Sequence, residues 1–402
     1  MSEWKKVRLG DLCYKVCSGG TPKSTCSAYY DGGTIPWLNT KEINYNRIYQ
    51  TESHITEEGL NNSSAKWIDA KSVIVAMYGA TAGRVAVAKI PMTTNQACCN
   101  LMIDKTKADY NFIYYYLSNS YKHLLSMANG AAQQNLNAQV IKDFIISLPD
   151  INEQHSIASF LSALDDKIAV NRRICENLEA QAQALFKHWF IDFAPFKNGK
   201  FVESELGMIP EGWRVGTLSE ISDINPSRTI KKGTISTYLD MKNMPTSGSF
   251  PINWEDKEFV GGMKFKNGDT LMARITPCLE NGKVAHVNFL RDGEIAFGST
   301  EYIVMTAKES IFPEFLYTLC RFPSFVNYAV KNMNGSSGRQ RVSGETISNY
   351  RMVIAPESVY SSVRPIFQEY MLQIRECGFE NLRLSTLRDT LLPKLMSGQI
   401  KV

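Results

Sequence analysis

The chain has 402 residues, of which 44% are hydrophobic and 21% charged, and this length predicts two or three domains. The composition is that of an ordinary globular protein, which excludes a fully disordered chain, a collagen and a small disulfide-rich protein. The formal net charge is +4 with a pI near 8.4, so the chain is mildly basic and unlike a histone-type polycation.

The start of the chain and its cysteines indicate a compartment. The first residues, MSEWKKVRL, lack the apolar core of a signal peptide. No stretch approaches the length of about 18 apolar residues that a membrane-spanning helix needs. The nine cysteines are scattered along the chain. We therefore expect a cytoplasmic protein with reduced thiols and no membrane partner.

In chain order, the first half is predicted to alternate strands and helices and then to form one long helix. SVIVAMYG (72–79) is typical of a buried strand, and FIYYYLSNSYKHLLSM (112–127) is typical of a helix. Helical composition then covers 150–193, where Asp150 and Glu153 have the spacing of a capping box. The segment 194–212 is rich in Gly, Pro and charge, which predicts a linker.

The second half is predicted to follow the same order. EYIVMTA (301–307) predicts a buried strand, 314–330 a helix, and the region from 357 to about 392 a second long helix. Pro365 is expected in the first turn of this helix, where proline is tolerated. Pro393 is expected to end or kink the helix. Gly378, in its middle, should cost about 1 kcal/mol relative to alanine.

The two long helices carry one heptad pattern. Ten positions of the first recur with alternating spacings of four and three: Ile157, Leu161, Leu164, Ile168, Asn171, Cys175, Leu178, Ala182, Leu185 and Trp189. Adding 206 to each number gives ten positions of the second: Val363, Phe367, Tyr370, Ile374, Cys377, Asn381, Leu384, Arg388, Leu391 and Leu395. Such a seam predicts a coiled-coil face. The constant offset favours a duplication over two unrelated amphipathic helices.

Shorter matches extend the repeat upstream of the helices. WLNTKEI (37–43) resembles YLDMKNM (238–244), and GRVAVA (83–88) resembles GKVAHV (282–287). We therefore predict a mixed α/β protein with two pseudo-symmetric α/β domains, at 1–149 and 213–356. Each domain is followed by a long helix, at 150–193 and, with a C-terminal tail, at 357–402, and the linker 194–212 joins the halves.

The seam also predicts how the two helices pair. If they run antiparallel with the largest overlap, Asn171 faces Asn381 and Cys175 faces Cys377. A polar pair in an otherwise apolar seam can fix the register at some cost in stability. Registers one heptad away would leave each Asn opposite an apolar residue.

The sequence contains no assembled catalytic or metal site. It has no G-x-G triplet and no Gly-Lys pair followed by Ser or Thr, which excludes the dinucleotide fingerprint and the Walker A loop. No two prolines are adjacent, so the N-P-P-aromatic motif of amino-methyltransferases is excluded, and the five histidines form no H-E-x-x-H. Cys13, Cys17 and Cys26 lack a C-x-x-C knuckle or a downstream Cys/His pair, so we expect no metal.

The positive charge lies outside the long helices. Residues 150–193 carry four Lys/Arg and seven Asp/Glu, and residues 357–396 carry five of each, which leaves +7 on the rest of the chain. The long helices are therefore poor phosphate binders, and a nucleic-acid surface is expected on the domains.

Basic, amide and hydroxyl side chains gather in or beside Gly-rich loops of both halves. Such side chains reach the phosphates and base edges of DNA, although for any one of them a solvated loop is the plainer interpretation. In the first half the candidate DNA contacts are Thr21, Lys23, Lys41, Arg84, Gln133, Gln134 and Asn135. In the second half they are Lys242, Arg274, Thr276, Lys283, Arg339, Gln340 and Arg341.

Three segments are shared with a known family: LFKHWFIDFAPF (185–196), LGMIPEGWRVGTLSEI (206–221) and LRDTLLPKLMSGQIKV (387–402). In that family, loops similar to NGAAQQNL (129–136) and NGSSGRQRV (334–342) close each recognition domain. On these segments, essentially the whole chain resembles the specificity subunits of type I restriction–modification enzymes.

The resemblance implies two target-recognition domains, each reading one half of a bipartite, asymmetric site in double-stranded DNA. It implies antiparallel spacer helices that fix the gap between the half-sites. It also implies partners: two modification (M) subunits, which methylate adenine with S-adenosylmethionine, and restriction (R) subunits, which use ATP and Mg. The chain itself is then expected to hold no cofactor and to catalyse nothing. Base-reading residues do not carry over, because these domains vary with their targets.

Two other functions stay open at this point. The first is a methyltransferase or nuclease fused to recognition domains, against which the missing motifs argue. The second is a coiled-coil scaffold that does not bind DNA. A methylation assay of the isolated chain tests the first, and salt-dependent retention on DNA tests the second.

Overall fold

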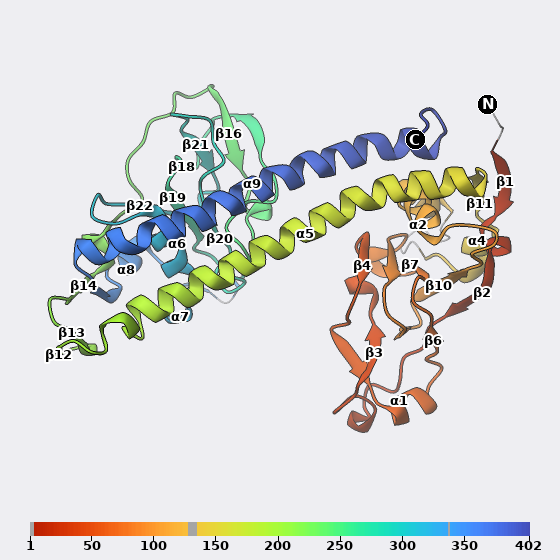
Figure 1. Ribbon diagram of the computed structural model, residues 1–402, viewed down its shortest axis with the longest axis horizontal. Helices are drawn as coiled ribbons and strands as arrows, with labels where there is room; N and C mark the ends of the chain where they lie inside the picture. The colour runs from red at the N-terminus through yellow and green to blue at the C-terminus, as the bar shows by residue number, and fades with distance from the viewer. Residues whose placement is uncertain (1–3, 128–134, 337) are drawn as a thin grey trace. The chain divides into compact units, whose positions relative to one another are not determined.

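The computed structural model describes residues 4–127, 135–336 and 338–402. The chain divides into two compact units (Figure 1). The first unit is Met1–Asp166 with Ser385–Val402, and the second is Lys167–Leu384. Each unit combines a mixed α/β domain with a stretch of both long helices, so each domain is completed by residues from distant parts of the chain.

The described residues of the first unit form three sheets. A two-stranded sheet pairs the first strand of the domain with the last, β1 (Lys5–Arg8) with β11 (Ile145–Leu148). A five-stranded sheet has the order β2 (Cys13–Ser18), β10 (Cys98–Ile103), β7 (Val73–Ala76), β8 (Val85–Ala88) and β4 (Asn46–Ile48). A four-stranded sheet has the order β5 (Ser53–Ile55), β3 (Ile35–Leu38), β9 (Met92–Thr94) and β6 (Trp67–Ile68). The predicted buried strand at 72–79 is β7.

Four short helices accompany these sheets: α1 (Glu57–Asn61), α2 (Tyr110–Asn119), α3 (Tyr121–Ser126) and α4 (Ala138–Asp143). The single helix predicted at 112–127 is therefore two helices, α2 and α3, which meet at Ser120. The Asp109 carboxylate caps α2 by accepting from the Phe112 backbone N–H at 2.9 Å. Phe112 then packs in one core with Val73 and Val85, which places α2 on the central sheet.

The second unit repeats these strand orders, except that its described central sheet has no counterpart of β4. Its two-stranded sheet pairs β14 (Arg214–Thr217) with β23 (Arg351–Ile354). Its central sheet has the order β15 (Ser222–Ile224), β22 (Tyr302–Ala307), β19 (Asp269–Ala273) and β20 (Val284–His286). Its third sheet has the order β17 (Glu255–Glu258), β16 (Ile235–Leu239), β21 (Ala296–Gly298) and β18 (Met263–Phe265). The matching orders in both units support the duplication.

The helices of the second unit also follow the first. They are α6 (Pro313–Arg321), α7 (Pro323–Lys331) and α8 (Gly344–Ser348). The predicted helix at 314–330 is broken between α6 and α7, where Pro323 occupies the first turn of α7. The predicted linker 194–212 contains a hairpin of β12 (Phe201–Ser204) and β13 (Gly207–Pro210).

The two long helices are α5 (Ile151–Phe190) and α9 (Glu357–Met396). The Asp150 side chain accepts from the backbone N–H of Glu153 at 3.1 Å, as its place before the helix predicts. The expectation that Pro365 lies in the first turn of α9 was wrong, and Pro393 does not end the helix. Pro365 lies in the third turn, because the helix begins at Glu357.

The helix also continues past Pro393 to Met396. Leu395 and Met396 are buried in the core of the first unit, at 1% and 4% exposure. This burial stabilises the last turn by more than the missing N–H of Pro393 destabilises it. Ile400 of the C-terminal tail packs on the same core as Trp4.

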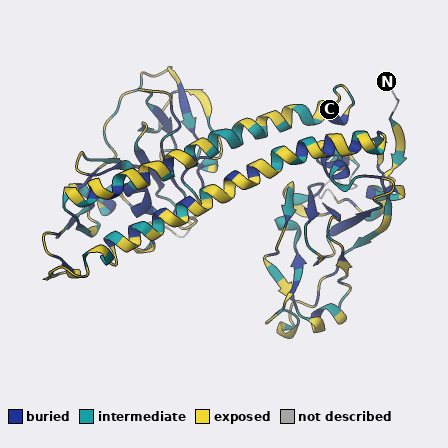
Figure 2. Ribbon diagram, viewed as in Figure 1, coloured by how far each residue is buried: buried dark blue, intermediate teal, exposed yellow. Residues whose placement is uncertain are grey.

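The seam of the long helices is covered along its length. All twenty seam positions are buried or half-buried, whereas many residues between them are exposed (Figure 2). In the second unit, Asn171 Nδ2 donates to Asn381 Oδ1 at 3.0 Å and to Glu380 Oε2 at 2.7 Å. The two Asn that the register pairs are thus hydrogen-bonded.

Neighbouring seam positions have the same register. Burial raises the pKa of Cys175 to about 12, and the nearby Cys377 thiol adds to the shift. The Tyr370 hydroxyl donates to Gln181 Oε1 at 3.3 Å, further along the pair. Because numbers rise along α5 as they fall along α9, the helices are antiparallel within this unit.

Gly378 has a packing role that its helix propensity does not indicate. A Cβ at this position would lie 2.6 Å from Phe250 Cγ. The Phe250 ring also meets Phe379, Trp254 and Phe289 edge-on. The glycine therefore allows an aromatic cluster of the second unit to approach the helix.

We expect Gly378→Ala to lower the free energy of unfolding by about 1–3 kcal/mol, because overpacking outweighs the helix propensity gained. Denaturant unfolding of the whole chain measures this change. Ser361→Ala, at an exposed position of the same helix, is the matched control and should be neutral or slightly stabilising. A more stable Gly378→Ala variant would contradict the packing role.

Candidate nucleic-acid interface

Both units bring the same two loops together at one end of the central sheet. In the first unit, the backbone N–H of Leu136 donates to the carbonyl of Met77 at 2.9 Å. This bond joins Leu136 to the turn between β7 and β8. In the second unit, Val342 N–H donates to Arg274 O at 3.0 Å, and joins 334–342 to the turn between β19 and β20.

The first of these loop pairs carries Arg84 and Asn135. The Arg84 side chain is half-buried, and its Nη1 donates to Asn44 Oδ1 at 2.9 Å. Asn135 is exposed. Gln133 and Gln134 lie outside the described residues. The described loop pair thus presents a guanidinium held by a neutral amide.

The second loop pair carries two arginines around one carboxylate. Arg341 Nη2 lies 2.7 Å from Glu301 Oε1, and Arg274 Nε lies 4.0 Å from Glu301 Oε2. The hydrogen bonds from Arg341 lower the pKa of Glu301, so this carboxylate is ionised at neutral pH. Two guanidinium groups against one carboxylate leave a net positive charge at the turn.

The remaining candidates of this loop pair have mixed exposure. Arg339 is exposed, whereas Thr276 and Gln340 are half-buried. The Gln340 backbone N–H donates to Thr276 Oγ1 at 2.9 Å, and the Thr276 N–H donates to Gln340 O at 3.0 Å. Thr276 and the Gln340 backbone therefore hold the two loops together, and Arg339 is the most open side chain of this set.

A 3-10 turn lies beside each loop pair, and each of these turns carries one of the candidate lysines, Lys41 or Lys242. In the second unit it is η7 (Met241–Asn243), where Lys283 Nζ donates to Met241 O at 2.6 Å. Lys242 is exposed on the same turn, 3.8 Å from Asp240. In the first unit it is η3 (Thr40–Glu42), where Lys41 forms an exposed ion pair with Glu52 at 2.6 Å.

The matched segments 37–43 and 238–244 thus occupy matched places. Each lies beside the turn that carries Arg84 or Lys283. Lys41 is partly neutralised by Glu52, which makes it a weaker candidate for a phosphate contact than Lys242.

Thr21 and Lys23 belong to a different part of the first unit. Both are exposed, and the Thr21 hydroxyl donates to the Gln96 side chain. Trp37 Nε1 donates to Gly20 O at 2.9 Å, so the described contacts of this loop run to the four-stranded sheet rather than to the turn that carries Arg84.

The structure also shows residues that the sequence did not single out. Asn44 holds Arg84, and Glu301 holds Arg341. Tyr45, beside Asn44, has a left-handed φ of 53° and stands edge-on to Tyr121. Asn44 follows the matched segment 37–43 directly, which is a usable signal. No sequence signal marks Glu301, because its partner Arg341 is 40 residues away.

The described residues offer no evident metal centre: no group of three His, Cys, Asp or Glu among them is placed to hold an ion. All nine cysteines are described and free. Across the described parts of the chain, no helix is both long and apolar enough to cross a membrane.

Comparisons with known proteins agree with this architecture. A family model described as "Type I restriction modification DNA specificity domain" matches residues 1–180. The MjaIX specificity subunit of Methanocaldococcus jannaschii is 28% identical over an alignment of 424 residues, which covers 100% of this chain and 94% of that protein. The HindI specificity subunit of Haemophilus influenzae is 22% identical over an alignment of 476 residues, which covers 100% of this chain and 100% of that protein. Residues 1–180 thus match the specificity domain of this family, and the whole chain is similar to specificity subunits of type I restriction enzymes.

A solved structure supports the fold of this chain. The crystal structure of the S subunit of a type I restriction–modification system from M. genitalium is 19% identical. It has a TM-score of 0.57 and covers 98% of this chain and 96% of that chain. The predicted mixed α/β fold with long helices is confirmed. Which residues of the chain contact DNA stays a prediction.

Proposed function

We propose that the chain is the sequence-reading subunit of a type I restriction–modification complex, and that each half reads one half of a bipartite, asymmetric site in double-stranded DNA. The observation that carries this proposal is the duplicated loop pair. In both units, a turn of the central sheet is hydrogen-bonded to the segment just before the last short helix of the domain. Among the described residues, Arg84 and Asn135 lie there in the first unit, and Arg274, Arg339, Gln340 and Arg341 in the second.

Charge supports the same surface. The long helices carry a net charge of −3 and 0, and the linker 194–212 has two Lys and three Glu, so the two domains hold the excess of Lys and Arg. Phosphate contacts by such side chains supply affinity, whereas contacts to base edges supply specificity. The matched loops of the two units lie on the same fold but differ in sequence, so each could contact the bases of a different half-site.

The proposal includes partners that carry the chemistry. Two M subunits with S-adenosylmethionine would methylate adenine, and R subunits with ATP and Mg would translocate and cleave DNA. The chain would hold no cofactor and would act by positioning these subunits at the site. The missing nucleotide and methyltransferase motifs in its sequence support a non-catalytic role.

The direct test is binding and catalysis by the purified chain. We expect retention on DNA that weakens with salt, with a slope of log affinity against log salt of about −0.9 per phosphate contact. We expect no methyl transfer when S-adenosylmethionine is added, and no cleavage when ATP and Mg are added. Methyl transfer or cleavage by the chain alone would indicate a fused enzyme, and absence of DNA retention would indicate a scaffold.

Arg84 and Lys283 occupy matched places, and both are expected to face DNA. Each of Arg84→Ala and Lys283→Ala should weaken DNA binding and reduce the magnitude of the salt slope by about 0.9, without unfolding the chain. Fluorescence anisotropy with a labelled duplex at several salt concentrations measures both quantities. Arg172→Ala removes an exposed cation from the acidic helix α5 and is the matched control.

The control should bind DNA as the unchanged chain does. If Arg84→Ala and Lys283→Ala behave like Arg172→Ala, these two residues do not contact phosphates.

A further inference from the structure

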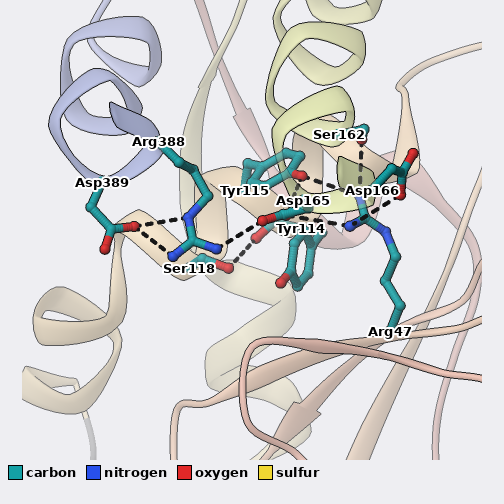
Figure 3. A network of polar contacts seen from close by, with 9 residues as sticks. All are labelled: Arg47, Tyr114, Tyr115, Ser118, Ser162, Asp165, Asp166, Arg388 and Asp389. Carbon is teal, nitrogen blue, oxygen red and sulfur yellow. Dashed lines mark hydrogen bonds and ion pairs between the residues drawn. The ribbon is translucent and has the colours of Figure 1, made fainter. Parts of the chain in front are cut away.

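A nearly buried carboxylate joins the first domain to both long helices. Asp165, on α5, is 13% exposed, and its Oδ2 accepts from the Tyr115 hydroxyl at 2.6 Å and lies 3.3 Å from Arg47 Nη1. Its Oδ1 accepts from Arg388 Nη1 of α9 at 2.8 Å. Arg47 Nη2 also donates to Ser162 Oγ at 2.9 Å. These five residues form the Asp165 network (Figure 3).

The network uses both oxygens of one carboxylate for two different elements. One oxygen holds the domain, through Arg47 and Tyr115, and the other holds α9, through Arg388. Charge-assisted hydrogen bonds are directional and roughly twice as strong as neutral ones. Asp165 therefore fixes an angle between the domain and the helix pair as well as a distance.

A short segment connects this network to the candidate DNA-facing turn. Arg47 belongs to β4, which pairs in parallel with β8, so that Arg47 lies opposite Val87. Three residues earlier, Asn44 accepts from Arg84, the candidate phosphate contact at the start of β8. Between them, the Tyr45 N–H donates to Val85 O at 2.9 Å. Residues 44–47 thus contact the turn at one end and α5 at the other.

The second half of the chain provides an internal comparison. At the offset of 206 residues, the counterpart of Asp165 is Met371, which is 2% exposed, and the counterpart of Arg388 is Ala182. There, Arg375 of α9 donates to the backbone carbonyl of Asn288 at 2.6 Å. The same fold therefore forms with a methionine and an alanine at these places, and the duplicated architecture does not require the charges.

Burial makes the charges costly, so their presence needs another reason. Two ions taken from water lose hydration that their attraction regains only when the geometry is good. Buried polar groups are best explained where they specify one arrangement among several. In the first unit, these charged groups specify how the domain is oriented on the stretches of α5 and α9 that it contacts.

We propose that Asp165, Arg47 and Arg388 are positioning residues, which hold the reading face of the first recognition domain at a fixed angle to the spacer helices. On the basis of the proposed function, this angle sets how strictly the chain discriminates the gap between its half-sites. The network contacts no DNA in this proposal. It acts through residues 44–47 and the helix pair.

The test compares gap tolerance in the full chain with its M subunits. Methylated-adenine mapping first identifies the site, and duplexes then carry both half-sites at the native gap and at gaps one and two base pairs shorter or longer. We expect Asp165→Asn to keep both half-site sequences while the preference for the native gap over its neighbours falls about tenfold. A duplex with one scrambled half-site measures sequence preference in parallel.

Two further variants keep the result clear. Asp166→Asn changes the adjacent carboxylate, which is 66% exposed and 3.9 Å from Arg47, and should leave the gap profile unchanged. Arg388→Ala copies Ala182 and removes the contact between Asp165 and α9, together with the Arg388–Asp389 ion pair on α9 itself. We expect it to fold and to relax the gap preference, so that it tests the proposal even if Asp165→Asn does not fold.

The outcomes separate the two proposals. A folded Asp165→Asn or Arg388→Ala variant with the gap profile of the unchanged chain would overturn the positioning role and leave the proposed function intact. If the unchanged chain shows no preferred gap or no sequence preference, the proposed function itself fails. Lower thermal stability with an unchanged gap profile would identify the Asp165 network as structural only.

Discussion

Replacing residues 1–149 with the first recognition domain of another specificity subunit is expected to change one half-site and to leave the other half-site and the gap unchanged. The duplication predicts this result, because each unit has its own sheets and its own core. Each mismatched base pair costs about 1–3 kcal/mol. A half-site of three or four altered bases should therefore lower affinity for the original site by about a thousandfold or more.

The structure refines how the exchange is made. The core of the first unit includes Ile157, Leu161, Leu395 and Met396 from the long helices, which an exchange of 1–149 leaves behind. An incoming domain must fit these side chains. A second chimera that exchanges 1–166 together with 385–402 replaces the whole unit. We expect both chimeras to read the same new half-site, and the second to be the more stable one.

Methylated-adenine mapping with the M subunits measures the outcome. The matched control is the reciprocal exchange in the second unit, which should change only the other half-site. Simultaneous change at both half-sites in either chimera would contradict separable reading by the two units.

The long helices were the part of the fold that sequence predicted best. A heptad pattern is local, so ten positions at one offset sufficed for the helices and for the facing pair Asn171 and Asn381. The ends were harder to predict. Pro393 favours termination locally, but the burial of Leu395 in a domain that is distant in sequence keeps the last turn helical.

The sheets could be predicted only in outline. Buried runs such as 72–79 and 301–307 identified strands, yet the strand orders depend on pairing between distant segments, such as β2 with β10. Two predicted helices are divided, at Ser120 and at Pro323. The break at Pro323 follows from local chemistry, because proline favours the first turn of a helix, whereas Ser120 makes no side-chain capping bond to α3. The proline break was accessible from sequence and the serine break was not.

The candidate site was predictable as loops but not as contacts. The matched Gly-rich segments are enough to indicate Arg84 and Lys283. That Asn44 holds Arg84, and that Glu301 lies between Arg274 and Arg341, depends on which strands are neighbours. The Asp165 network is less accessible still, since it joins residues that are 118 and 223 positions apart.

The helix pair is expected to set the gap by its length, and matched insertions test this. Both long helices run unbroken across the boundary between the units, at Asp166–Lys167 in α5 and at Leu384–Ser385 in α9. The antiparallel register places these two boundaries opposite each other. Seven residues inserted at both points keep the seam in phase and leave the cores of both units unchanged.

One inserted heptad adds about 10 Å of helix, or roughly three base pairs of DNA. Three base pairs also rotate a half-site by about a third of a turn, since a turn takes about 10–10.5 base pairs. We therefore expect the one-heptad variant to lose binding at the native gap, by about a hundredfold or more, because one half-site no longer meets its domain. Three inserted heptads add about 31 Å, close to one DNA turn of about 34–36 Å.

The three-heptad variant should therefore recover binding at a gap about nine or ten base pairs longer, with both half-sites again on one face of the duplex. Affinity measured across a series of gaps gives the result. A four-residue insertion in α5 alone is the control: it displaces Asn171 from Asn381 and should abolish any preferred gap. Undiminished binding of the one-heptad variant at the native gap would show that the helix pair does not set the spacing.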